Sequence, residues 1–196
     1  MDGEIFTIGH SNHPQATLLG LLGRHGIAAV ADVRSSPYSR HNPQFNREPL
    51  ERALRAAGVA YVHLGRELGG RPADRACYVD GKVRFDLIAR TPLFQAGLDR
   101  LRAGMRRQRL CILCAEKDPI ACHRFLLVCR HLAAPGIAIR HILEDGSLED
   151  HEAADRRLLA LLKIPGRDLF AGAAEQIEKA CTTQAARITR NAPASE

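Results

Sequence analysis

Short apolar segments alternate with amphipathic segments along most of this chain, and this alternation is the feature that most restricts its fold. Apolar runs with the length of buried strands occupy residues 5–8, 28–33, 59–64, 110–114 and 137–143. Segments with helical spacing of apolar residues occupy residues 15–24, 47–57, 94–107, 119–134 and 148–162. Near-continuous apolar strands separated by helices are typical of a parallel sheet covered on both faces. The sequence therefore predicts an α/β fold, a Rossmann-like three-layer sandwich with a mostly parallel sheet of about five strands.

The length of 196 residues and the apolar content of 45% suit one domain with a proper core. The alternation weakens after Pro165 and Gly166. We expect a single α/β domain over residues 1–164, followed over residues 165–196 by a C-terminal helix at 169–180 and a flexible tail from residue 182.

The first residues, MDGEIFTIGH, lack a charged segment followed by a long apolar stretch. We therefore expect a cytoplasmic protein with no membrane contact, whose six cysteines are mostly thiols.

Polar clusters follow four of the predicted strands, at residues 9–12, 32–36, 65–72 and 114–125. In open parallel sheets, ligands bind at the edge formed by the carboxyl ends of the strands. With the five predicted strands in the order 3-2-1-4-5, by analogy with common doubly wound sheets, His10 and Ser11 would face Cys114 and Glu116.

The segment CAEKDPIACHRF, residues 114–125, carries the densest set of reactive side chains. Asp118 and Pro119 are a typical helix start, and the free amides of such a start attract anions. Cys122, His123 and Arg124 then fall in the first turns. A thiol beside a helix N-terminus and basic side chains becomes a better nucleophile.

Cys114 ends its strand, and a side chain in that position points into the ligand-binding crevice, so Cys114 is the preferred nucleophile. Cys122 is the other candidate. However, Cys122, Phe125, Cys129 and Leu132 have helical spacing, which equally fits core packing.

Metal binding is a third interpretation, because Cys111-x-x-Cys114 followed by Cys122-His123 resembles a zinc-ligand spacing. Residues three apart on a strand point to opposite faces, so Cys111 and Cys114 do not share one ion. A site formed by Cys114, by Cys122 or His123, and by His10 stays open as an alternative.

His10 follows a glycine in a turn, where it would act as a general base or would bond the loop backbone. Asp32 and Arg34 occupy alternate strand positions on one face, so they would pair with each other or contact a ligand. The run Gly69-Gly70-Arg71 is a candidate backbone cradle for an anion. The dinucleotide fingerprint and the eight-residue phosphate loop are absent, so no cofactor is expected.

The net charge of +6 comes from arginine, with 24 Arg against 4 Lys. Arginine forks hold carboxylates and phosphates, which indicates a small anionic ligand, although genomic base composition also inflates arginine. On a helix Arg102, Arg106 and Arg109 share one side, which would be a solvated face or a contact with nucleic-acid phosphates.

Four motifs occur in order: TIGHSN, DVRSSPYSR with PQFNR, LGRELGGRP and CAEKDPIACHRFLL. Together they resemble the bacterial and archaeal family known as domain of unknown function 488, from about Phe6 to Leu159. The resemblance implies a compact α/β domain with a cysteine-bearing site. The positions that match its motifs are Gly9, His10, Ser11, Asp32, Arg34, Gly69, Gly70, Arg71, Cys114, Glu116, Cys122, His123 and Arg124.

The preferred hypothesis is a cysteine-dependent enzyme acting on a small phosphorylated or nucleotide-like substrate. The candidate catalytic residues are Cys114 as nucleophile, His10 or His123 for proton transfer, Glu116, and Cys122. The candidate substrate-binding residues are Ser11, Asp32, Arg34, Gly69, Gly70, Arg71 and Arg124. No resident metal is assigned. The alternatives are a nucleic-acid-binding protein without catalysis, and a Cys/His metal or redox site.

Overall fold

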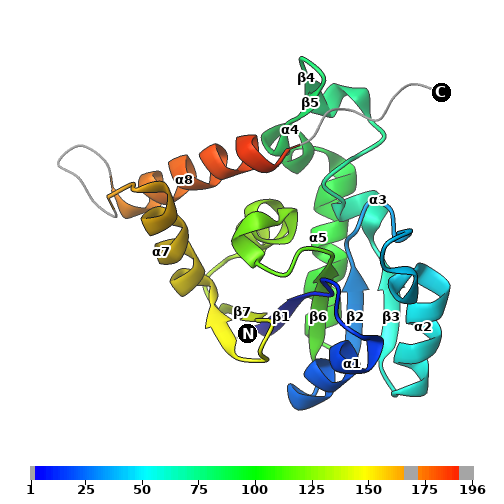
Figure 1. Ribbon diagram of the computed structural model, residues 1–196. Helices are drawn as coiled ribbons and strands as arrows, with labels where there is room; N and C mark the ends of the chain where they lie inside the picture. Colours follow the sequence, from blue (N-terminus) through cyan, green and yellow to red (C-terminus); the bar gives the residue numbers. More distant parts are fainter. Residues whose placement is uncertain (1–2, 166–171, 190–196) are drawn as a thin grey trace.

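A six-stranded sheet forms the centre of the protein, which is described by a computed structural model over residues 3–165 and 172–189 (Figure 1). The strands are β1 (Gly3–Gly9), β2 (Ala29–Asp32), β3 (Ala60–His63), β6 (Leu110–Cys114), β7 (Ile137–Ile142) and β8 (Leu148–Asp150). All neighbouring pairs are parallel except β7 and β8. The predicted α/β fold with a mostly parallel sheet is confirmed, and β8 is a sixth strand beyond the five predicted.

The strand order is β3-β2-β6-β1-β7-β8, so the assumed order 3-2-1-4-5 is wrong. The fourth predicted strand, β6, lies between β1 and β2 rather than outside β1. All five residues of β6 are buried, as suits an apolar strand in the middle of a sheet covered on both faces. In this register Cys114 lies opposite Gly9, and Leu113 lies opposite Asp32. Cys114, at the end of β6, therefore lies between the polar clusters that follow β1 and β2, and not beside the first of them alone.

Helices cover both faces of the sheet. On one face, α1 (Gln15–Arg24) and α2 (Arg47–Ala56) pack their leucines against β1, β2 and β6. On the other face lie α3 (Gly65–Leu68), α4 (Phe85–Ala89), α5 (Pro92–Met105), η4 (Arg124–Cys129) and α6 (Arg130–Leu132). Cys111 belongs to the first core and Cys114 to the second, which confirms that these two residues of β6 point to opposite faces.

The predicted continuous helix over residues 119–134 is wrong at its start. Asp118 does cap a turn, accepting a hydrogen bond from the Ile120 amide, but this turn is only the 3₁₀ helix η3 (Pro119–Ala121). Cys122 is then extended, with φ −134° and ψ 143°. The main helix begins afterwards, in the π-helix η4, because the Arg124 side chain reaches back to the carbonyl oxygens of Glu116 and Lys117.

Between β3 and α5 the chain forms elements that the sequence pattern did not indicate. They are the short helices α3 and α4, the 3₁₀ helix η2 (Arg75–Cys77), and a hairpin of β4 (Tyr78–Val79) and β5 (Lys82–Val83). The loop before α2 also contains a short 3₁₀ helix, η1 (Pro43–Phe45).

The C-terminal part differs from the prediction at two places. Residues 148–150, predicted as the start of a helix, form β8, and α7 (His151–Leu162) follows. The last helix, α8 (Ala173–Ile188), extends through residues 182–188, which were expected in a loose tail; residues 190–196 lie outside the described part. Ala180 and Cys181 of α8 pack with Ala154 and Leu158 of α7, and α8 runs from α7 toward the hairpin (Figure 1). Among the described residues, none of the helices has the length and apolar character needed to cross a membrane.

A buried carboxyl group in α7 makes the stability of the protein depend on pH. Asp155 is 9% exposed, and its Oδ1 has no hydrogen-bond partner among the described residues. Burial raises the pKa of Asp155 to about 6, while Arg130 acts in the opposite direction and Glu152 raises the pKa further. The unfolded carboxyl titrates near pH 3.9, at about the model-peptide value. The folded protein therefore holds this proton to a higher pH than the unfolded chain does. As the pH rises from about 4 to about 6, the free energy of unfolding falls.

We expect Asp155→Asn to abolish this loss of stability, because an asparagine side chain does not ionise. At pH 7 its free energy of unfolding should exceed that of the parent by about 2–3 kcal/mol, and at about pH 3 the two should be nearly equal. Denaturant unfolding across this pH range measures the difference. Glu175→Gln, at the exposed start of α8, is the control. If the free energies of unfolding of Asp155→Asn and the parent differed by the same amount at every pH, the prediction would be contradicted.

Candidate functional site

Four side chains converge just beyond the carboxyl end of β6: Cys114, Glu116, Cys122 and His123. Their donor atoms all lie within 4.8 Å of one another. Both thiols donate to Glu116 Oε2, each at 3.1 Å. His123 Nδ1 lies 3.5 Å from Cys114 Sγ and 4.0 Å from Cys122 Sγ. Two thiols, an imidazole and a carboxyl group thus form one cluster, which combines the predicted residues of the fourth polar segment.

The orientation of His123 is fixed by the backbone. Its Nε2 lies 3.1 Å from the carbonyl oxygen of Val33. A carbonyl oxygen only accepts, so Nε2 carries a proton, and in the neutral ring Nδ1 presents its lone pair to the thiols. Gly70 packs against this ring: a Cβ at Gly70 would lie 2.9 Å from His123 Cγ. This contact gives a structural reason for glycine at position 70.

Arg124 supports the cluster from behind. Its side chain is fully buried and donates to the carbonyl oxygens of Glu116 and Lys117, and weakly to Thr7 Oγ1. Its backbone N–H points at Cys122 Sγ, 3.4 Å away. No carboxylate of the described residues forms an ion pair with this guanidinium, so the nearby thiols are the groups that its charge acts on. Arg124 does not line the pocket beside the cluster.

The four clustered groups shift one another's protonation. Burial alone raises the pKa of Cys122, but the hydrogen bond with Cys114 and the positive charges of Arg124 and His123 hold that pKa well below its usual range. Burial and the adjacent Cys122 sulfur raise the pKa of Cys114. Burial also raises the pKa of Glu116. Burial lowers the pKa of His123, but contact with Cys122 more than offsets this and raises it overall. Cys122 therefore loses its proton more readily than Cys114, whose thiol needs a base in order to react.

A pocket of about 590 Å³ opens onto the cluster. Cys114, Glu116 and His123 line one side of it. Other lining residues come from the two neighbouring loops and from the end of α8: Arg34, Ser35, Gly70, Arg71, Arg187 and Ile188. Three of the four predicted polar segments, residues 32–36, 65–72 and 114–125, therefore meet at this pocket, whereas residues 9–12 do not line it.

Sequence reasoning missed Arg187 because it assigned this segment to a tail. The signal was the helical spacing of Ile177, Cys181, Gln184 and Ile188, which continues past residue 180.

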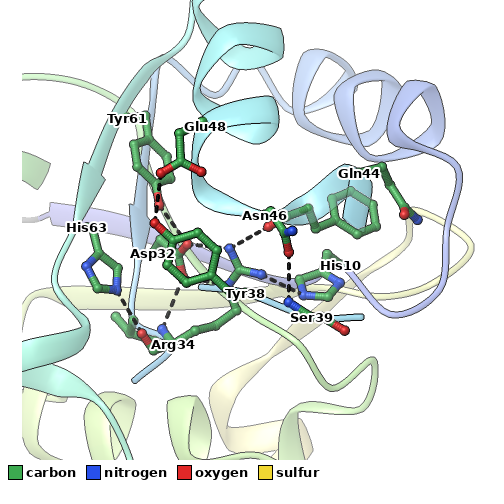
Figure 2. Close-up of polar contacts among 12 residues, drawn as sticks. His10, Asp32, Arg34, Tyr38, Ser39, Gln44, Asn46, Glu48, Tyr61 and His63 are labelled. Atoms are coloured by element: carbon green, nitrogen blue, oxygen red, sulfur yellow. Dashed lines mark hydrogen bonds and ion pairs between the residues drawn. The ribbon is translucent and has the colours of Figure 1, made fainter. Parts of the chain in front are cut away.

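Beside the pocket, a buried network holds Arg34 in place (Figure 2). Arg34 donates to Asp32 from Nε at 2.9 Å and from Nη2 at 2.6 Å, and the Tyr61 hydroxyl donates to the same carboxylate at 2.8 Å. The predicted pairing of Asp32 and Arg34 is confirmed. Arg34 Nη1 donates to His10 Nε2 at 3.1 Å, so Figure 2 shows the guanidinium between Asp32 and His10.

His10 belongs to this network and not to the thiol cluster. Its Nδ1 donates to the carbonyl oxygen of Ser11 at 2.8 Å, its Nε2 accepts from Arg34, and its ring stacks on Phe45 at 4.4 Å. Burial, with the charge of Arg34, lowers the pKa of His10 to about 4, so the ring is neutral at pH 7. In the described part of the chain, the group of close donor atoms excludes His10. The alternative metal site containing His10 is therefore not the arrangement found.

The remaining predicted residues shape the loops. The Ser11 amide donates to the Ala115 carbonyl at 2.8 Å, which ties the first loop to the cluster segment. Gly69 packs so closely on Ser35 that a Cβ would overlap its hydroxyl group. The Arg71 amide donates to Ser35 Oγ at 2.9 Å, while its exposed side chain lines the pocket.

The helix α5 ends at Met105, so Arg106 and Arg109 do not share a helical side with Arg102 as predicted. Three of the five arginines in residues 100–109 pair with acidic side chains. Arg100 pairs with Glu67, Arg102 with Asp99, and Arg109 with Glu4. Such paired surface arginines leave less free charge for phosphate contacts.

Comparison with known proteins gives one match. A family model described as domain of unknown function DUF488 matches residues 15–130, a range that includes the whole thiol cluster. No curated protein and no solved structure gives a significant match.

Proposed function

The chain belongs to the family described as domain of unknown function DUF488, and from its site we propose that it is a cysteine-dependent enzyme acting on a small phosphorylated or nucleotide-like substrate. The observation that carries this proposal is a thiol paired with an oriented imidazole at the wall of a pocket. Nucleophilic cysteines need three things: a base within reach, a group that orients the base, and access to the substrate. Cys114, His123, the Val33 carbonyl and the pocket supply these parts.

Cys114 is the proposed nucleophile, rather than Cys122. Cys114 lines the pocket, and its sulfur is nearer to His123 Nδ1, at 3.5 Å against 4.0 Å. Cys122 lies behind it and contacts the Arg124 backbone. We assign Cys122 and Glu116 to positioning the Cys114 proton and sulfur, and Arg124 to holding the loop that carries Glu116.

The charges of the pocket support an anionic substrate. Arg34 is neutralised by Asp32, but the guanidinium groups of Arg71 and Arg187 form no ion pair with any described residue. Glu116 is the pocket's own carboxyl group, and it faces the thiols. Two free guanidinium groups beside a nucleophile suit a phosphate or another anionic group.

The proposed reaction is a group transfer in which part of the substrate is bound covalently to the Cys114 sulfur. The Cys114 sulfur forms a bond to the electrophilic centre of the substrate while the bond to the leaving group breaks. The thiol proton passes to His123 Nδ1 and then to the leaving group. Water afterwards adds to the same centre, the bond to sulfur breaks, and the thiol is restored.

Trapping the covalent intermediate tests the proposal. Metal-free protein is incubated with a panel of nucleoside mono-, di- and triphosphates and sugar phosphates, quenched in acid and digested with trypsin. The two candidate thiols fall in different tryptic peptides, residues 110–117 and 118–124. In a Cys111→Ala background, we expect a substrate-derived mass on peptide 110–117. An adduct confined to 118–124, or no adduct and no turnover across the panel, would refute the proposal.

Nucleic-acid binding carries less weight as a function. It was suggested by the arginines of residues 100–109, and three of these are paired with acidic side chains. The metal alternative has a specific observation in its favour, the close approach of four ligand-type side chains.

A further inference from the structure

We propose that Cys114, Glu116, Cys122 and His123 also form a Zn²⁺ site, and that the bound ion reversibly silences the Cys114 thiol. The metal site rests on the geometry, chemistry and charge of its four donors and does not depend on the proposed function. The silencing rests on the proposed thiol chemistry.

The spacing of the donor atoms fits one tetrahedral ion. Zinc bonds of about 2.0 Å to nitrogen or oxygen and about 2.3 Å to sulfur place neighbouring ligand atoms roughly 3.3–3.8 Å apart. Here the sulfur–oxygen distances are both 3.1 Å, and the sulfur–nitrogen distances are 3.5 and 4.0 Å. All four donors lie within 4.8 Å of one another, so small side-chain shifts suffice to enclose an ion.

The chemistry of the donors selects zinc. Two thiols, an imidazole nitrogen and a carboxylate oxygen are ligands that Zn²⁺ takes in tetrahedral sites, whereas Mg²⁺ and Ca²⁺ take oxygen. His123 also has the support typical of a zinc ligand, since its other ring nitrogen donates to the Val33 carbonyl and leaves Nδ1 free to bind.

Charge balance gives an independent argument. Two buried cysteines contact the carboxyl group of Glu116, and without a cation three negative charges this close together cannot all form. A divalent ion together with the buried Arg124 guanidinium balances two thiolates and one carboxylate. The unpaired charge of Arg124 then has a counterpart in the loaded site.

The number of ligands decides what the ion does. Four protein donors fill a tetrahedral shell and leave no position for a substrate or water, which is the mark of a closed site. A zinc-bound sulfur is not free to attack, so loading blocks the thiol. Both cysteines are buried, but Glu116 is exposed at the pocket, which gives the ion a route in and out.

Metal titration tests the site without any substrate. Protein stripped by a chelator is titrated with Zn²⁺ against a chromophoric chelator, and separately with Co²⁺. We expect one ion per chain, with the near-ultraviolet sulfur-to-cobalt absorption and the visible bands of tetrahedral Co²⁺. Glu116→Gln should weaken zinc binding by at least about tenfold, whereas Glu144→Gln, an exposed carboxylate paired with Lys117, should not change it.

Cys122→Ser is a second ligand variant. It should weaken binding by at least about a hundredfold and reduce the sulfur-to-cobalt absorption. Circular dichroism confirms that each variant is folded, and either folded ligand variant suffices for the comparison. A folded parent that binds no Zn²⁺, or that binds Co²⁺ without sulfur-to-cobalt absorption, would show the inference to be wrong and would leave the thiol enzyme intact.

Activity measurements separate the inference from the proposed function. With the substrate found by adduct trapping, one equivalent of Zn²⁺ should abolish turnover and a chelator should restore it. If zinc binds with sulfur ligation but turnover requires the ion, the metal site stands and the thiol mechanism falls. If zinc binds and turnover is unchanged, the silencing is refuted.

Discussion

Replacing Cys114 by serine is expected to lower kcat/KM by at least about a thousandfold, the scale seen when a covalent nucleophile is removed. A serine hydroxyl is a far weaker nucleophile than a thiol near neutral pH. It is also much less acidic, so His123, 3.5 Å from the Cys114 sulfur, can remove a thiol proton far more easily than a hydroxyl proton. The measurement is steady-state turnover of the substrate identified by adduct trapping, in metal-free buffer.

Cys111→Ala is the matched control for this prediction. Cys111 lies three residues earlier on the same strand, is fully buried, and points to the opposite face of the sheet. Its replacement should cost some stability but leave kcat/KM within about twofold once unfolded protein is excluded. A mild effect at Cys114 together with a thousandfold loss in Cys122→Ser would move the nucleophile to Cys122.

Alanine at Gly9 should destabilise the protein by about 3 kcal/mol and abolish turnover in whatever fraction still folds. A Cβ at this position would overlap the carbonyl group of Glu116 and lie 3.0 Å from Lys117 Cα, and both are backbone atoms that cannot rotate away. The segment carrying Glu116 would have to lift off the end of β1. That movement would break the bond from the Ser11 amide to the Ala115 carbonyl and displace the carboxyl group from the two thiols.

Gly20→Ala provides the comparison for Gly9→Ala. Gly20 is exposed within α1, and a Cβ there meets nothing within 4 Å. Alanine in a helix interior is favoured over glycine, so this variant should gain up to about 1 kcal/mol. Denaturant midpoints measure both effects. A Gly9→Ala protein as stable as the parent would show that the segment carrying Glu116 can move away from Gly9 at no cost, and the prediction would be wrong.

The pattern of the chain determined the layers of the protein. The strictly apolar run at residues 110–114 predicted a strand because a strand buried on both faces needs apolar side chains throughout, and the mostly apolar run at 137–143 predicted another. Helical spacing located α1 at its observed bounds, since one buried face recurs every three to four residues. The same local rules placed the reactive side chains after strand ends, and therefore at one edge of the sheet.

Tertiary structure alone decided which of these side chains meet. Strand order depends on how crossovers pack over the sheet, which no local period encodes, and the insertion of β6 between β1 and β2 set the neighbours of Cys114. The chain is extended at Cys122, and Arg124 folds back onto the carbonyl groups of Glu116 and Lys117, so the helix signal of Asp118 and Pro119 yields only a short 3₁₀ turn. His10 was drawn to Arg34, and His123 was turned to the thiols by Val33, because each buried polar group had to find a partner that lies far away in the sequence.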